Sequence, residues 1–313
     1  MNTKQTPLLV ALVLATAATA PAPLRAQARP QAPIFGAGIE IINLSLSVTD
    51  AQNNFVTDLG QRDFAVFEDG IRQELSLFTH ENLPISMVLM IDTSASMEEK
   101  LATAQAAAIK FTKTLREQDV AQIVQFNDRA TTLQPFTNDP AALEAAIKKT
   151  EASGPTALHN ALYIALKDLM KDKKAAELRR RAIVLLSDGE DTASLVSDEQ
   201  VLELAKKSEI NIYAISLRPS RASDRQRQAF SQAEYLVNAL TRETGGRAFF
   251  PSSIGELDSV YDRIAEELRT LYSIGYVSSN ARRDGKWRRI VVRVPDREGI
   301  TVRHKLGYYA PRS

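Results

Sequence analysis

The stretch Ser86–Met97, which reads SMVLMIDTSASM, is the starting point for interpreting this chain. Its first part, Met87–Ile91, is an unbroken apolar run, typical of a strand buried on both faces and too short to span a membrane. Side chains that carry oxygen follow at every second position: Asp92, Ser94 and Ser96. A buried strand that leads through a polar loop into a helix is where α/β folds place ligand sites.

The residue types in this loop indicate a particular kind of ligand. One carboxylate and two hydroxyls provide hard oxygen donors, which suit Mg²⁺, Mn²⁺ or Ca²⁺ better than zinc or copper. The loop also fits a second interpretation, a capping box in which Ser96 and Glu99 begin the alanine-rich helix predicted over residues 98–117. Both interpretations are compatible with the loop alone.

Strand and helix patterns alternate from residue 86 to about residue 272. Apolar runs predict further strands at 120–126, 131–136, 182–187, 211–217 and 247–250. Amphipathic periodicity predicts helices at 98–117, 140–150, 157–172, 198–208, 228–243 and 256–270. This alternation predicts an α/β fold with a doubly wound, mainly parallel sheet. The strand at 131–136 follows its predecessor after a very short link, so we expect it to be antiparallel.

The flanks of this region read as β structure. Upstream, we expect a strand at 39–48 with a bulge near Ile42, and strands at 63–67 and 72–78 joined by a Glu68-Asp69-Gly70 turn. Downstream, we expect a strand at 272–278 and a hairpin of 289–294 with 300–306. The two flanks together predict a small β-sandwich. The expected division is 1–28 signal peptide, 29–38 proline-rich linker, 39–83 N-terminal β region, 84–271 α/β domain and 272–313 C-terminal β region.

The first residues predict export. Lys4 precedes an apolar stretch at 7–19, and Ala26-Gln27-Ala28 fits a signal-peptidase site. An uncleaved membrane anchor is the alternative, but the apolar stretch is shorter than a spanning helix needs. Cleavage would leave a periplasmic or secreted protein with no stable membrane insertion. The chain has no cysteine, so disulfides, thiolate metal sites and a cysteine nucleophile are excluded.

The charge balance argues against nucleic acid as a partner. Lys and Arg number 39 against 38 Asp and Glu, and cleavage after Ala28 would remove two basic residues and no acidic one. A nearly neutral chain has no overall electrostatic attraction to phosphate backbones.

Two later stretches complete the candidate site. In Ser153-Gly154-Pro155-Thr156, a turn places Thr156 at the start of a predicted helix, where it could equally be an N-cap. In residues 183–191, which read IVLLSDGED, a second apolar strand ends in Ser187 and Asp188. This end of the strand could also be an ordinary turn. Neighbouring parallel strands end at one edge of a sheet, so we expect Asp92 and Asp188 to share a crevice with Thr156. Two adjacent buried carboxylates repel each other unless a cation lies between them.

These motifs, DTSASM after an apolar strand, Thr156 in a GPTAL turn, and LLSDGED, resemble the von Willebrand factor type A domain in order and context. The resemblance covers about residues 84–270. It implies that the chain holds a divalent cation, Mg²⁺ first and Mn²⁺ or Ca²⁺ as alternatives, in a metal-ion-dependent adhesion site (MIDAS). The ligands or water-bridged ligands implied are Asp92, Ser94, Ser96, Thr156 and Asp188. Pro155 replaces the glycine that is common before the threonine.

The flanks resemble a narrower group. Asp63-Phe64-Ala65-Val66-Phe67-Glu68-Asp69-Gly70 and the later Asp284-Gly285-Lys286-Trp287-Arg288 are similar to segments of exported von Willebrand-related proteins of Acidobacteria. Little function is established for that group, so this likeness concerns architecture.

The expected function is binding to a protein partner that offers an Asp or Glu carboxylate to the metal, without catalysis. A Mg²⁺-dependent phosphatase of the haloacid dehalogenase type is one alternative, but it needs a second acid where this chain has Ser94. A serine hydrolase lacks support because there is no G-x-S-x-G. The other alternative is a scaffold protein whose metal site is unused.

Overall fold

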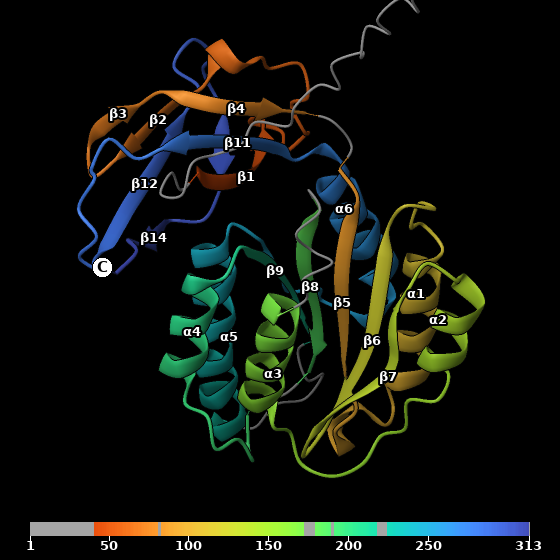
Figure 1. The fold of residues 1–313 in the computed structure, drawn as a ribbon. Coiled ribbons are helices and arrows are strands. Elements are labelled where there is room, and N and C mark those ends of the chain that lie inside the picture. Colours follow the sequence, from red (N-terminus) through yellow and green to blue (C-terminus); the bar gives the residue numbers. More distant parts are fainter. Residues whose placement is uncertain (1–40, 81–82, 172–178, 189–190, 218–223, 313) are drawn as a thin grey trace, which may run out of the picture. The chain divides into compact units, whose positions relative to one another are not determined.

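Strand β5 (Ile85–Asp92) lies in the middle of a six-stranded sheet in the computed structural model (Figure 1). The strand order is β10-β9-β8-β5-β6-β7, and every pair is parallel except β6 with β7. The other members are β6 (Val120–Phe126), β7 (Ala130–Thr137), β8 (Arg180–Ser187), β9 (Ile210–Ser216) and β10 (Ala248–Phe249). The predicted mainly parallel sheet with one antiparallel strand is therefore confirmed.

The structure describes residues 41–80, 83–171, 179–188, 191–217 and 224–312, which all belong to one unit, residues 40–313. The predicted signal peptide and linker lie outside the described residues. Among the helices that are described, none combines the length and apolar character that crossing a membrane requires.

Helices cover both faces of the sheet because β5 is apolar on both faces. Met87, Leu89 and Ile91 pack in one core with helices α1, α2 and α6, whereas Val88 and Met90 pack in a second core with α3, α4 and α5 (Figure 1). This alternation follows from the two-residue period of a strand. The bounds are α1 (Leu101–Thr112), α2 (Pro140–Ile147), α3 (Leu158–Lys171), α4 (Asp198–Lys207), α5 (Asp224–Thr244) and α6 (Leu257–Thr270).

Helix α1 is shorter than predicted at both ends. Residues 95–97 form a 3-10 turn, η2 (Ala95–Met97), and the helix begins only at Leu101. At the other end, the Thr112 and Thr114 hydroxyls donate to the carbonyls of Ile109 and Phe111, and the chain turns. The alanine-rich composition extended the prediction because it favours a helix wherever it occurs. Two further 3-10 turns are η1 (Gln61–Asp63) and η4 (Ile254–Glu256).

The two flanks of the chain form a β-sandwich of two four-stranded sheets, as predicted. One sheet has the order β13-β1-β11-β4 and the other β14-β12-β2-β3. In chain order the strands are β1 (Ile41–Thr49), β2 (Ala65–Glu68), β3 (Ile71–Gln73), β4 (Leu75–Thr79), β11 (Tyr272–Val277), β12 (Trp287–Arg293), β13 (Thr301–Arg303) and β14 (Gly307–Tyr309). Each sheet contains strands from both flanks, and a third apolar cluster joins their inner sides.

The register of these strands corrects three expectations. The predicted hairpin of 289–294 with 300–306 is wrong, because β12 pairs with β2 and β14 whereas β13 pairs with β1 in the other sheet. The expected strand 72–78 is divided between the two sheets as β3 and β4. Strand β1 pairs with β11 without a register shift from Ile41 to Leu46, so the bulge expected near Ile42 is absent there. The Asp69-Gly70 turn is confirmed, with positive φ at both residues.

Candidate metal site at the carboxyl edge of the sheet

Three loops meet where the parallel strands end. Asp92 is the last residue of β5, and Asp188 directly follows β8, which pairs with β5 in parallel register up to Ile91 and Leu186. Thr156 lies in the loop before α3. That loop contacts the residues after β5, because Ala95 N donates to Gly154 O at 3.0 Å and Ser153 N donates to Thr93 O at 2.8 Å. The topology therefore gathers the five predicted residues at one edge.

Asp92 is the most deeply placed of the five. Its side chain is fully buried, and its two oxygens accept hydrogen bonds from Ser94 N at 2.8 Å and from Ser187 Oγ at 2.5 Å. Burial raises the pKa of Asp92 above its ordinary value, and the nearby Asp188 charge adds to this effect, while the bonds from Ser187 and Ser94 oppose it. A carboxylate in such a place is stabilised by a neighbouring positive charge.

Asp188 is also buried, and side chains engage both of its oxygens. Ser96 Oγ donates to Oδ1 at 2.8 Å, and Lys100 Nζ donates to Oδ2 in an ion pair. Ser96 is in turn 3.1 Å from the Ser94 hydroxyl. Asp188 and the two serines thus form one hydrogen-bonded group, with Ser96 on its exposed side.

The capping interpretation of Ser96 is wrong. Helix α1 begins at Leu101 with Lys100 as its N-terminal cap residue, so Ser96 precedes the helix by a full turn. The Ser96 hydroxyl bonds to Ser94 and Asp188 instead of to a helix N–H.

The capping interpretation of Thr156 is wrong as well. Helix α3 begins two residues later, and its first N–H groups are satisfied by another loop: His159 N donates to Asp191 Oδ2 at 2.8 Å and Asn160 N to Ser194 Oγ at 3.0 Å. Thr156 is instead held by its backbone, since its carbonyl accepts from Thr192 N at 2.8 Å. Its N–H donates to Thr192 Oγ1 at 3.0 Å, and the residue as a whole is 5% exposed.

The donor set fits a hard divalent cation. Two carboxylates and three hydroxyls are present, without nitrogen or sulfur, which matches the ligand preference of Mg²⁺, Mn²⁺ or Ca²⁺. Among the described residues, no three acidic, histidine or cysteine side chains form a metal-binding group. Any metal here would therefore be held mainly by neutral hydroxyls around Asp92 and Asp188.

Sequence reasoning missed the residues that support these five. Ser187 bonds to Asp92, Lys100 to Asp188, and Thr192 to the Thr156 backbone. Lys100 stands four residues after Ser96, a spacing that places residues on one side of a helical turn and could have identified it. His159 holds the loop after β8, with Nδ1 3.2 Å from both Asp191 Oδ2 and Val196 O.

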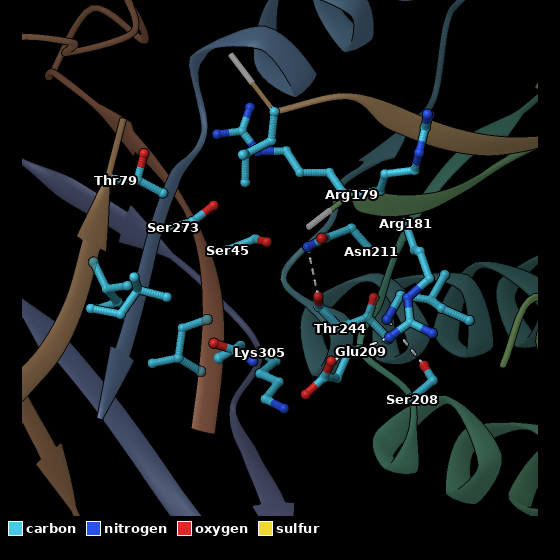
Figure 2. Close-up of a pocket in the computed structure, with 17 residues that line it drawn as sticks. Ser45, Thr79, Arg179, Arg181, Ser208, Glu209, Asn211, Thr244, Ser273 and Lys305 are labelled. Atoms are coloured by element: carbon cyan, nitrogen blue, oxygen red, sulfur yellow. Dashed lines mark hydrogen bonds and ion pairs between the residues drawn. The ribbon is translucent and has the colours of Figure 1, made fainter. Parts of the chain in front are cut away.

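A separate cavity of about 280 Å³ lies at the opposite, amino edge of strands β8 and β9 (Figure 2). Its basic side chains are engaged by the protein itself: Arg180 donates to Leu268 O at 3.0 Å and Arg181 to Glu209 at 3.2 Å. Asn211 Nδ2 donates to Thr244 O at 2.9 Å across its floor. These lining side chains already bond to other parts of the protein. The cluster at the carboxyl edge of the sheet is therefore the better candidate for a ligand site.

The doubly wound sheet places this protein among the α/β folds, and its oxygen-rich cluster lies at the carboxyl edge, where such folds bind ligands. Residues 87–190 match the family model of the von Willebrand factor type A domain. The chain therefore carries a von Willebrand factor type A domain, as the three motifs predicted. The narrower likeness to Acidobacterial proteins stays a prediction.

Individual proteins are also similar to this chain. An uncharacterised protein of Synechocystis sp. is 32% identical over 112 residues, and the match covers 35% of this chain but only 26% of that protein. A von Willebrand factor type A structure from Catenulispora acidiphila aligns with a TM-score of 0.50 at 13% identity, covering 88% of this chain and 74% of that one. Proximal thread matrix protein 1 from the mussel byssus, described with a zinc-occupied MIDAS motif, aligns with a TM-score of 0.50 at 16% identity, covering 65% and 50%. At these identities the structures support the fold alone.

Proposed function

We propose that this protein is an exported, metal-dependent protein-binding module. A divalent cation held by Asp92, Ser94, Ser96, Thr156 and Asp188 would accept a carboxylate from an Asp or Glu of a partner. The observation that carries this proposal is the hydrogen-bonded group of Ser94, Ser96 and Asp188 beside the buried Asp92. The zinc-occupied motif of the mussel protein supports metal binding in this fold.

The cation would supply an electrophilic position for the partner's carboxylate. Mg²⁺ takes six oxygen ligands, and hydroxyl donors leave much of its positive charge uncompensated. The exposed Ser96 lies on the side from which a partner would approach. Asp92 would anchor the ion from the buried side, while Thr156 would contribute its hydroxyl from the neighbouring loop.

An exposed apolar side chain on the loop that bonds to Thr156 supports a protein as the partner. Leu195 is 95% exposed, although its backbone is fixed: Asn160 Oδ1 accepts from Leu195 N at 3.1 Å and from Val196 N at 3.0 Å. The same loop bonds to Thr156 through Thr192. An exposed leucine on a loop that bonds to Thr156 fits a partner segment in which an apolar residue lies near the acidic one, because a single carboxylate contact is weak.

The first test is calorimetric titration of the EDTA-stripped protein with Mg²⁺, Mn²⁺ and Ca²⁺. We expect one saturable site in the wild type and none in Asp92→Asn, which keeps the shape of the side chain but removes its charge. Asp119→Asn is the matched control: Asp119 is equally buried but bonds to Ile85 N at the amino edge of the sheet. It should bind metal as the wild type does.

Absence of binding by the wild type would contradict the metal site and favour the scaffold alternative. If metal binds, the second step is retention of envelope or extracellular proteins on the immobilised wild type with Mg²⁺ and with EDTA, beside Asp92→Asn. Retention that needs both Mg²⁺ and Asp92, and that is competed by an identified acidic peptide, would support the proposed function.

A further inference from the structure

Lys100 places a positive charge inside the candidate metal site. Its ammonium forms an ion pair with Asp188 Oδ2, and the Asp188 side chain is only 1% exposed. Among the ion pairs of the described residues, this is the one that contacts either Asp92 or Asp188. With both carboxylates ionised, the ammonium offsets one of their two negative charges.

The backbone holds Lys100 at this position. Lys100 N donates to Met97 O at 2.9 Å, and its carbonyl accepts from Ala104 N at 3.0 Å, so the residue connects η2 to α1. Its side chain nevertheless remains 21% exposed. A long lysine side chain that reaches solvent can therefore leave Asp188 without any movement of the main chain.

A divalent cation and the ammonium would compete for the same carboxylate. Asp188 Oδ1 already accepts from Ser96, so Oδ2 is the oxygen that Lys100 occupies. A metal ion between Asp92 and Asp188 would meet the ammonium at close range, where like charges repel strongly in a poorly solvated site. Binding of the metal would thus displace Lys100 or occur against its charge.

We propose that Lys100 is an internal counter-cation, which neutralises Asp188 in the metal-free protein and competes with the divalent ion for it. This inference rests on the proposed metal site and deepens it. Lys100 would keep the two-carboxylate cluster stable in a metal-poor environment and would weaken divalent affinity, so that occupancy responds to metal concentration.

The test combines Mg²⁺ titration and thermal unfolding of the purified full chain. In Lys100→Met, the Mg²⁺ dissociation constant should fall by about tenfold or more, because the competing charge is gone. The Tm of the EDTA-treated variant should fall by about 3–6 °C, since Asp188 stays buried without its partner. Saturating Mg²⁺ should remove most of that difference.

Three variants make the result specific. Lys100→Gln can still donate a hydrogen bond to Asp188 and should also bind Mg²⁺ more tightly, which keeps the test valid if Lys100→Met fails to fold. Lys100→Arg keeps the charge and should show no gain in affinity. Lys110→Met is the matched control on helix α1, which Lys100 directly precedes. Lys110 pairs with Asp258 where both side chains are about half exposed, so this variant should leave Mg²⁺ affinity unchanged.

The outcomes separate this inference from the proposed function. Saturable Mg²⁺ binding that is equal in the wild type, Lys100→Met and Lys100→Gln would overturn the competition while leaving the metal site intact. Weaker binding in both neutral variants would overturn it too, since Lys100 would then be positioning Asp188 for the metal. Binding by none of these proteins would overturn the metal site itself.

Discussion

Among single residues, Ser187 is one whose side chain bonds directly to the buried carboxylate of Asp92. Its hydroxyl donates to Asp92 Oδ2 at 2.5 Å inside the sheet edge. Because Asp92 is fully buried, bulk water cannot supply the missing hydrogen bond if this donor is removed. Mutation of a group that orients a metal ligand in this way typically lowers metal affinity by about 10- to 100-fold.

Ser187→Ala should therefore weaken Mg²⁺ binding by about 10- to 100-fold. It should also lower the free energy of unfolding of the metal-free protein by about 1–3 kcal/mol. Calorimetric titration and urea unfolding measure the two effects. Ser216→Ala is the control, because Ser216 is the residue paired with Ser187 on the neighbouring strand β9. Unchanged affinity in Ser187→Ala would mean that Ser187 does not orient Asp92.

At the scale of elements, His304 is the point where the chain crosses from one sheet of the sandwich to the other. It lies between β13 and β14, which belong to different sheets. His304 Nε2 accepts from Val292 N at 3.1 Å, and Nδ1 is 2.6 Å from Lys305 O. This pattern requires a neutral ring, and burial lowers the pKa of His304 below its ordinary value of 6.5.

The sign of the resulting pH dependence follows directly. As pH falls below 6.5, the unfolded chain binds a proton at His304 while the native ring stays neutral, so unfolding becomes more favourable. The stabilisation is complete above that pH and is lost below it. We expect the wild type to lose more stability than His304→Gln when pH is lowered from about 7.5 to about 5.5, measured by urea unfolding.

His80→Gln is the control for this prediction. Burial also lowers the pKa of His80, which stacks on Tyr272 with ring centroids 4.2 Å apart. That variant should keep the pH dependence due to His304. Equal pH dependence in the wild type and His304→Gln would show that the crossing point is insensitive to protonation.

At the scale of the whole molecule, a buried polar network ties the two flanks of the chain together. Glu68 from the first flank accepts from Tyr276 at 2.9 Å and Tyr308 at 3.0 Å, and pairs with Arg288 at 3.4 Å. Burial and the Glu68 charge raise the pKa of Tyr276, which keeps its hydroxyl protonated and donating. The network lies in the sandwich, whereas the candidate metal site lies at the carboxyl edge of the six-stranded sheet.

Arg288→Met should lower the free energy of unfolding by about 3–5 kcal/mol, because Glu68 would remain as an unpaired buried charge. Mg²⁺ affinity of the folded variant should not change. Urea unfolding and calorimetric titration test both statements, with the exposed neighbour Arg289→Met as a control expected to stay within about 0.5 kcal/mol. Altered Mg²⁺ affinity in Arg288→Met would show that the sandwich and the site are coupled.

The central sheet, its helices and the order of the site motifs could all be predicted from the amino-acid sequence. Those features depend on local patterns. An apolar run such as Met87–Ile91 indicates a strand buried on both faces, and helical periodicity indicates a helix buried on one face. The convergence of Asp92 and Asp188 was also predictable, because parallel neighbouring strands end at the same edge. The sandwich followed from β patterns on both sides of the α/β region.

The contacts between side chains that lie far apart in the chain could not be predicted from local patterns. The Lys100–Asp188 pair, the bond from Ser187 to Asp92 and the capping of α3 by Asp191 join residues far apart in the chain. The hairpin expected after residue 289 is wrong for the same reason: adjacency in sequence favoured pairing of 289–294 with 300–306, but β13 pairs with β1 in the other sheet of the sandwich. A local hydrophobic pattern indicates that a face is buried. Which segment packs against that face depends on the packing of the whole chain.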